Sequence, residues 1–284
     1  MMNEPVSHAE LITPVTVIRP SRGWRAVNLL EIWEYRELLY FLSWRDVMIR
    51  YKQAALGIAW AVLQPLIAMV IFSVIFGKLA KLPSENVPYP IYSFAALLPW
   101  QLFAGALQRA GTSLVTNANL VTKVYFPRIV MPIAAIASGL VDFCVSFVVL
   151  VLMMFYYGVT PTWAMLTIPL FVLYTLLTAI AVSLWISALN VQYRDMQHTL
   201  PFLIQAWMFA SPVAYSAELV PAGNWQLIYA LNPMTGVIQG FRWALLGAQP
   251  PGAMMWVSLA VVIVLFVSGL YYFTKMERTF ADIV

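Results

Sequence analysis

The chain has 284 residues, of which 62% are hydrophobic and 10% are charged, with a formal net charge of +4 and a mean hydropathy of +0.80. Soluble domains carry about a quarter charged residues, so this composition excludes a soluble globular protein and indicates an integral membrane protein. The single cysteine, Cys144, lies in an apolar run, which excludes a disulfide framework. We therefore expect an all-helical, polytopic membrane protein.

Residues 1–27 are expected to form an irregular cytoplasmic tail, because prolines and arginines occur there without an apolar stretch. For the same reason no cleaved signal peptide is expected. Residues 28–53 should form an amphipathic interface helix along the cytoplasmic face of the membrane. Asp46 and Arg50 stand four residues apart, acid first, which supports this helix. Its mixed charge favours the docking of a protein over the alternative, a purely lipid-bound helix.

Residues 54–284 should form one transmembrane domain with six spans. The first is an uncharged stretch at 53–77, which is long enough for about 30 Å of hydrocarbon. Short polar segments separate it from five further apolar stretches along the chain. These stretches are residues 91–108, 131–157, 163–189, 198–215 and 253–274.

The segment 218–246 is apolar but interrupted. No charged residue lies between Glu218 and Arg242, yet Pro221, Pro233 and three glycines break a continuous helix. Basic residues gather near both ends of the chain, so both termini are expected in the cytoplasm and the number of spans must be even. We therefore expect this segment to enter from the outside and return as a re-entrant helical hairpin. Such backbone is tolerated where it lines a cavity or is buried in protein.

Residues 110–130 are expected to form an inner loop that contains a short helix. The sequence NANLVTKVYFPRIVMP at 117–132 begins with polar residues, continues with one apolar turn and meets Pro127, before which a helix should end. The apolar residues of this turn need a surface that buries them. An ordinary inner loop that obeys the positive-inside rule is the alternative interpretation.

Tyr89, Tyr92, Trp100 and Phe103 form an aromatic stripe. On a helix of 3.6 residues per turn they lie within about 60° of one another and extend over about 21 Å, too far for a single membrane interface. The C–H faces of sugars rest on aromatic rings, and hydroxyl or amide groups can bind their OH groups. The stripe predicts an uncharged polysaccharide conduit, although packing within the helix bundle also explains each residue. Further conduit candidates are Trp60, Trp207 and Tyr215.

Asp142 is the one acidic residue inside a predicted span. A charge at the bilayer centre costs about 2.5–3.5 kcal/mol, so this carboxylate needs a partner, for which Arg109, Arg128 and His198 are candidates. A structural ion pair is the favoured interpretation, and a proton or ion site is the alternative. Other basic residues should lie at the level of the inner lipid headgroups, where the pyrophosphate of a lipid-linked substrate could bind. These residues are Arg36, Arg50 and Lys52.

Residues 45–65 carry the pattern R-D-x-x-x-R-Y-K-x-x-x-L-G-x-x-W-x-x-x-x-P, which resembles the start of the first span in type-2 ABC exporter permeases. More narrowly, it is similar to the branch that exports O-antigens, teichoic acids and capsular polysaccharides. The sequence at 117–132 resembles the coupling helix of this family. Residues 193–195, 211–213 and 232–233 extend the resemblance, which covers about residues 44–242.

The resemblance implies a homodimer with a central conduit, and two copies of a separate cytoplasmic P-loop ATPase that bind ATP and magnesium. It implies export of lipid-linked polysaccharide across the bacterial cytoplasmic (inner) membrane, with no cofactor on this chain. The residues expected to couple this chain to the ATPase are Arg45, Asp46, Asn119, Leu120, Val121, Lys123, Val124, Tyr125, Phe126, Pro127 and Arg128. The residues expected at an outer gate are Pro221, Trp225, Asn232 and Pro233.

The sequence contains no G-x-x-x-x-G-K-[ST] motif and no His/Cys cluster with the spacing of a metal site. We therefore expect no catalytic residues, no metal and no nucleic-acid partner for this chain. Two other interpretations stay open. One is an ABC exporter of a small lipophilic compound, and the other is an integral-membrane lipid-modifying enzyme, which would need polar catalytic residues clustered at one face.

Overall fold

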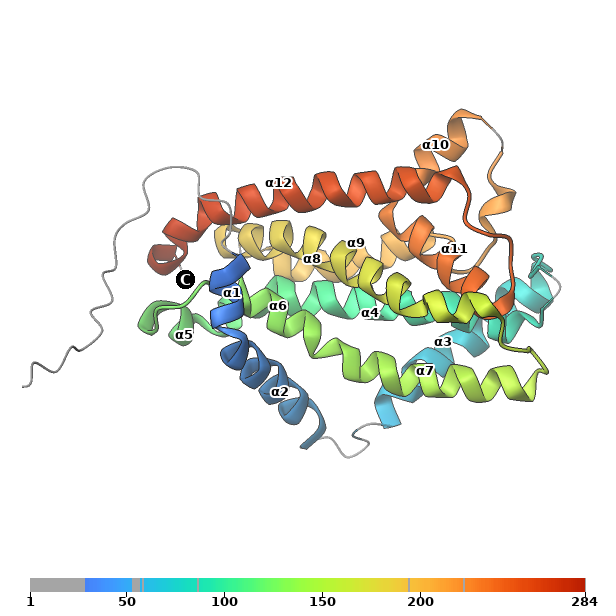
Figure 1. Ribbon diagram of the computed structural model, residues 1–284, viewed down its shortest axis with the longest axis horizontal. Coiled ribbons are helices and arrows are strands. Elements are labelled where there is room, and N and C mark those ends of the chain that lie inside the picture. The colour runs from blue at the N-terminus through green and yellow to red at the C-terminus, as the bar shows by residue number, and fades with distance from the viewer. Residues whose placement is uncertain are drawn as a thin grey trace, which may run out of the picture.

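The structure is a computed structural model that describes residues 29–52, 57, 59–85, 87–193, 195–221 and 223–283 (Figure 1). The predicted tail at 1–27 lies outside the described residues, as do Gln53 and Arg194. The described part of the chain is helical and contains no strand, which confirms the expected all-α class.

The helices of the N-terminal half begin with the predicted interface helix, which is divided in two. They are α1 (Leu29–Glu34), α2 (Arg36–Lys52), α3 (Ala59–Phe72) with its π-helical continuation Ser73–Leu79, α4 (Tyr89–Thr116), α5 (Ala118–Lys123), α6 (Val130–Ala137) and α7 (Gly139–Tyr156). The C-terminal half holds long helices and the segment of the predicted hairpin, whose re-entrant path stays a prediction. Its elements are a 3₁₀ turn at Trp163–Thr167, α8 (Ile168–Gln192), α9 (Met196–Phe209), a 3₁₀ turn at Ala217–Leu219, α10 (Asn224–Ala230), α11 (Pro233–Leu246) and α12 (Ala253–Ile283).

Five helical stretches among the described residues are long and apolar enough to cross a membrane. They are Ala59–Leu79, Tyr89–Thr116, Val130–Tyr156, Trp163–Gln192 and Ala253–Glu277, and they match five of the six predicted spans. The other predicted span, 198–215, contains α9. Its 14 residues cover about 21 Å, less than the roughly 30 Å of hydrocarbon in a bilayer. The count of six spans therefore stays a prediction.

The second predicted span is longer in the structure. Helix α4 continues to Thr116, so residues 110–116 are helical instead of belonging to the inner loop. The prediction ended this span at residue 108, just before the charged Arg109. However, Ala110 and Leu114, one and five residues further on, are fully buried. Arg109 has partners inside the bundle, described below, so its charge does not end the apolar helix.

Helix α4 is the centre of the bundle. In the most apolar 18 residues of this helix 78% of the residues are buried. The corresponding share is 11% for the stretch Ala59–Leu79 and 17% for Ala253–Glu277. It contacts α3, α6, α7, α8 and α11, and Figure 1 shows it running among the other long helices. Tyr92, Phe94 and Phe103 of α4 are fully buried. The outward faces of α3 and α12 are thus left for lipid or for another protein chain.

The bundle has two distinct ends (Figure 1). At one, which we call the α2–α5 end, Leu42, Val121, Phe126 and Phe280 share an apolar cluster. Helices α10 and α11 lie towards the other, the α10–α11 end. Tyr89, at the start of α4, lies at the second end, and its hydroxyl donates to the carbonyl of Ala214. The chain between α8 and Ala214 therefore passes from the first end to the second.

The predicted hairpin segment forms two short helices instead of one long one. The Asn232 side chain caps α11 by accepting a hydrogen bond from the Met234 N–H at 3.0 Å, and Pro233 occupies its first turn. Gly247 ends the helix in the left-handed conformation, with φ of 68°. Helix α11 contacts α4, α8 and α12, and most of its residues are buried.

We expect Gly240→Ala to destabilise the bundle, because a Cβ atom at this position would lie 2.0 Å from Cε1 of Phe171 on α8. The ring or α11 must move, at a cost of about 1–3 kcal/mol. The apparent Tm in detergent should fall, and a second substitution, Phe171→Leu, should restore part of it. Gly252→Ala is the control, since a Cβ there would meet no atom within 4 Å. Equal melting of the Gly240 and Gly252 variants would contradict the close packing of α11 on α8.

Candidate functional site

A cavity of about 790 Å³ opens between α3, α4, α7 and α9. Most of its lining is uncharged, with Trp60 and Gln64 from α3, Trp100 and Gln101 from α4, and Gln205 from α9. Aromatic rings and amides together suit a ligand that has both apolar C–H faces and hydroxyl groups. Within the described lining, charges occur only in a small group at one side of the cavity: Arg50, Arg109 and Asp142.

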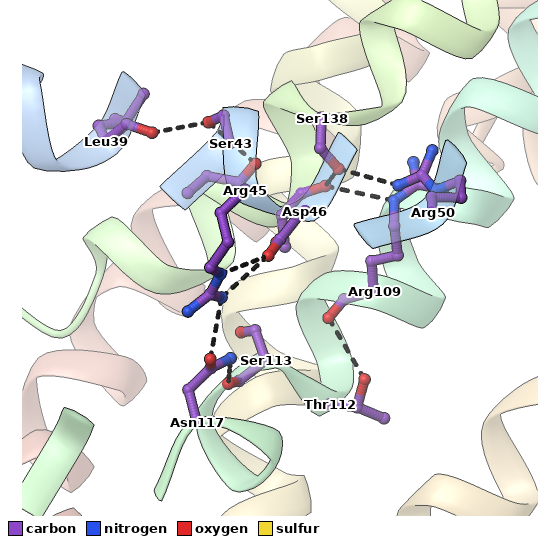
Figure 2. Close-up of polar contacts among 12 residues, drawn as sticks. Leu39, Ser43, Arg45, Asp46, Arg50, Arg109, Thr112, Ser113, Asn117 and Ser138 are labelled. Carbon is purple, nitrogen blue, oxygen red and sulfur yellow. Dashed lines mark hydrogen bonds and ion pairs between the residues drawn. The ribbon is translucent and has the colours of Figure 1, made fainter. Parts of the chain in front are cut away.

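These charges belong to a cluster, here called the inner cluster, that joins α2 to α4 and α7: Arg50, Tyr51, Arg109, Ser138 and Asp142. Arg50 forms an ion pair with Asp142 and donates to the Ser138 hydroxyl at 3.1 Å (Figure 2). Nη1 of Arg109 lies 3.8 Å from Oδ2 of the same carboxylate. The predicted structural ion pair of Asp142 therefore has Arg109 as one partner, as expected, and Arg50 as a second that the sequence analysis did not name.

The hydroxyl of Tyr51 donates a hydrogen bond to Asp142. Burial, with a further contribution from this hydrogen bond, raises the pKa of Tyr51 to about 12. The phenol is therefore protonated at physiological pH and can act as a donor. Arg109 is held in place by its Nε, which donates to the carbonyl of Ala135 at 3.3 Å. Gly139 provides the space for its guanidinium, since a Cβ there would lie 2.1 Å from Nη2 of Arg109.

A second polar group connects α2 to the end of α4. Nη2 of Arg45 lies 2.9 Å from Oδ1 of Asp46 and 2.9 Å from Oδ1 of Asn117, as Figure 2 shows. Asn117 stands between α4 and α5, and its amide donates to the Ser113 carbonyl at 2.8 Å. Ser43 donates to the Ala134 carbonyl on α6 at 3.2 Å. These contacts connect α2 to α6 and to the residue between α4 and α5.

The predicted coupling residues divide into two groups. Val121 and Phe126 are buried in the apolar cluster of the α2–α5 end, at 2% and 7% exposure, while Val124 and Tyr125 are 52% and 69% exposed. Arg128 is bound to α12, because its backbone N–H donates to Glu277 at 2.9 Å and its guanidinium donates to the Glu277 carbonyl. The buried residues and Arg128 hold the segment on the bundle. The other predicted residues on this loop are exposed or half-buried: Asn119, Leu120, Lys123 and Pro127.

The structure brings together only part of the predicted conduit. Trp60 and Trp100 line the cavity, whereas Tyr89, Tyr92 and Phe103 are buried, at 9%, 0% and 0% exposure. Phe103 packs edge-on against Trp207, with ring centroids 5.2 Å apart. Tyr215 lies at the α10–α11 end of the bundle, where its hydroxyl accepts a hydrogen bond from the Tyr229 hydroxyl at 3.1 Å. A conduit role for all seven aromatic residues stays a prediction, and Trp60 and Trp100 are the members placed at the cavity.

The three predicted headgroup residues are also separated. Arg50 lies in the inner cluster, while Lys52 is exposed at the end of α2. Arg36 is exposed and lies over the ring of Trp33, 5.7 Å from its centroid. Only Arg50 of the three reaches the cavity.

The predicted gate residues lie at the α10–α11 end. Asn232 joins the end of α9 to the start of α11, since its amide donates to the Ser211 hydroxyl at 2.9 Å and its Oδ1 accepts from Nε1 of Trp207 at 3.0 Å. Pro233, beside it, is buried, whereas Pro221 and Trp225 are exposed. Asn232 and Pro233 are thus built into the packing, and the other two lie on the surface.

One polar residue that the sequence analysis named only as the end of an uncharged stretch is central to this end. Arg242 is 2% exposed, and its guanidinium lies 3.7 Å from the ring centroid of Tyr92. It donates to the carbonyls of Val213 and Tyr215 at 2.9 and 3.0 Å. Its isolation in a long uncharged segment was the available signal, because a lone charge in an apolar helix requires a specific environment.

A helical membrane bundle with a mostly uncharged cavity and a loop that exposes apolar side chains at one end is typical of the membrane subunit of a transporter. Residues 37–246 match the model of the ABC-2 type transporter family, so the chain belongs to this family. It is 30% identical over 255 residues to the O-antigen export system permease protein RfbA of Myxococcus xanthus, an alignment that covers 89% of this chain and 97% of the relative.

Two further groups of relatives match nearly the whole chain. An O-antigen export system permease protein RfbA of Klebsiella pneumoniae is 28% identical, over 87% of this chain and 95% of the relative. The polysialic acid transport protein KpsM of Escherichia coli is 23% identical, over 82% of this chain and 91% of the relative.

Proposed function

We propose that this chain is the membrane-spanning permease subunit of an ATP-driven exporter of lipid-linked polysaccharide in the bacterial inner membrane. The cavity carries this proposal: Trp60, Trp100 and several glutamines line it, and a sugar polymer needs aromatic and amide contacts more than charge. The names of the relatives, which export O-antigen or transport polysialic acid, support the same substrate class. ATP and magnesium are bound by a separate ATPase subunit.

The α2–α5 end faces the cytoplasm in this proposal, with both termini on that side and six crossings of the membrane. Two observations support it. The chain that includes α9 passes from one end of the bundle to the other, which supports the proposed sixth crossing. The exposed apolar residues Val124 and Tyr125 suit a binding surface for a soluble ATPase.

The functional unit is proposed to be a homodimer with two ATPase copies. The cavity wall includes the exposed glutamines Gln64, Gln108 and Gln205. Polar side chains are expensive in hydrocarbon and usually face protein or water. A second copy of the chain on this side would remove these amides from lipid and turn two open cavities into one conduit.

The test has two parts. In one, the gene that encodes the chain is deleted from the host; in the other, the tagged protein is purified from the host in mild detergent. We expect loss of surface polysaccharide on deletion and a P-loop ATPase in stoichiometric amount on purification. If the polysaccharide persists and the ATPase is stimulated by lipophilic compounds, the chain exports small molecules instead. If it purifies alone, the enzyme interpretation is favoured.

The double variant Trp60→Ala and Gln64→Ala should reduce polysaccharide export more than fivefold without loss of the ATPase complex. Both residues line the cavity and both are exposed, so their removal leaves no void in the core. This set is more informative than Tyr92 and Phe103, whose replacement would cost about 3–5 kcal/mol of stability. The control is Trp163→Ala, an 88% exposed tryptophan outside the cavity. Equal export by both variants would exclude the cavity as the path.

A further inference from the structure

A second cavity, of about 260 Å³, lies at the α10–α11 end of the bundle. Its walls come from Glu85 before α4, from Gln226 of α10, from Gln239 and Arg242 of α11, and from the segment that connects α11 to α12. It is separate from the large cavity: the two share no lining residue.

Two buried polar atoms in the wall of this cavity lack a partner. Arg242 uses both terminal nitrogens on backbone carbonyls, but its Nε has no hydrogen-bond partner among the described residues. The same holds for Oε1 of Gln239, one helical turn earlier on α11. Unpartnered buried groups are rare in native proteins and indicate that water or a ligand completes them. One unused donor and one unused acceptor therefore belong to side chains that line the same cavity.

The charges around the cavity select against ions. Arg242 is its only described cationic lining residue and Glu85 its only described anionic one, so an anion would meet the carboxylate and a cation would meet the guanidinium. Glu85 is oriented by the Ser216 hydroxyl, which donates to it at 2.9 Å, and by the Tyr92 hydroxyl at 3.4 Å. The site therefore favours a neutral ligand that can both donate and accept hydrogen bonds.

The size of the cavity and its other lining residues restrict the class of ligand further. The volume is just below the about 300–1,000 Å³ of drug-sized ligand pockets and far above the about 30 Å³ share of one water molecule. Gln226 and Gln249 add two amides, while Pro250 and Met254 supply an apolar surface. Amides, one carboxylate and one guanidinium around an apolar wall match a single sugar ring, with hydroxyls at its edge and C–H groups on its face.

We infer that this cavity is a saccharide-binding subsite that holds one neutral sugar unit of the polymer at the exit end of the bundle. The choice of a sugar among neutral polyhydroxylated ligands rests on the proposed function. The subsite lies beside the gate region, since Arg242 binds the carbonyls of Val213 and Tyr215 at the turn after α9. A unit bound there would hold the emerging chain at the outer side while the following units pass through the bundle.

The test measures binding of short, lipid-free oligosaccharides, made by mild acid hydrolysis of the host's own surface polysaccharide. The chain with its ATPase, in nanodiscs, is examined by saturation-transfer NMR. We expect wild-type protein to bind, and Gln239→Leu and Glu85→Gln to bind at least fivefold more weakly. Gln239→Leu removes an unpartnered buried oxygen, so its folding should be unimpaired. Gln197→Leu, an exposed glutamine at the start of α9 and outside both cavities, should bind as wild type.

Absence of binding by the wild type, or equal binding by all variants, would overturn the subsite. The deletion experiment separates this outcome from failure of the proposed function. If deletion abolishes surface polysaccharide but Gln239→Leu and Glu85→Gln bind as wild type, the export function stands and the subsite is wrong. If deletion leaves the polysaccharide unchanged, the substrate class is wrong, and with it the reason to choose a sugar.

Discussion

The double substitution Val124→Asp and Tyr125→Asp is expected to leave the chain folded and in the membrane while lowering export more than tenfold. Val124 and Tyr125 are 52% and 69% exposed and directly follow α5, so two charges there disturb no packing within the bundle. These exposed apolar residues belong to the surface that we propose binds the ATPase. Two carboxylates in that surface would be desolvated without partners, so the ATPase should fail to co-purify.

Two comparisons make this result specific. Gln197→Asp with Thr199→Asp adds the same charge at exposed positions of α9, and should keep both export and the ATPase. Val121→Asp places a charge in the buried cluster and should instead lower the yield of folded protein. An intact complex in the Val124/Tyr125 variant would show that the ATPase binds elsewhere on the chain.

Asp142→Ala should destabilise the chain, because it removes the only charged side chain of α7. It leaves Arg50 and Arg109 facing each other without the carboxylate that pairs with both. Side-chain exposure of 28% for Asp142 places the loss between an exposed ion pair, about 0.2–1 kcal/mol, and a buried one, about 3–5 kcal/mol. A loss of about 2 kcal/mol should lower the apparent Tm by roughly 4–8 °C.

The matched change is Asp142→Asn, which keeps the size and the acceptor for Tyr51 and should cost less. Asp195→Ala removes an exposed acid at the start of α9 and should melt as wild type, since surface changes are usually within about 0.5 kcal/mol. If Asp142→Ala melts as wild type too, the inner cluster does not hold α2 to the bundle. The cluster would then be a feature of the cavity alone.

The stripe on α4 shows where helical periodicity stops being informative. Spacing placed Tyr89, Tyr92, Trp100 and Phe103 on one face, but α4 is surrounded by other helices, so that face is mostly packing. Only Trp100 reaches the cavity. Whether a face of a membrane helix meets lipid, protein or a conduit depends on its neighbours, because hydrocarbon and a protein core select the same apolar residues.

The sequence alone determined the membrane class, five of the apolar helical stretches, the N-terminal helical segment, the short helix α5 and the family resemblance. These follow from runs of apolar residues, from breaks at proline and glycine, and from charges at the ends of spans, all of which are local signals. Only the tertiary structure decided that Arg50 and Arg109 share Asp142, that Arg242 is enclosed, and where the two cavities lie. Such pairs are brought together by packing between distant helices, so the sequence shows that a charge inside a span needs a partner but not which side chain provides it.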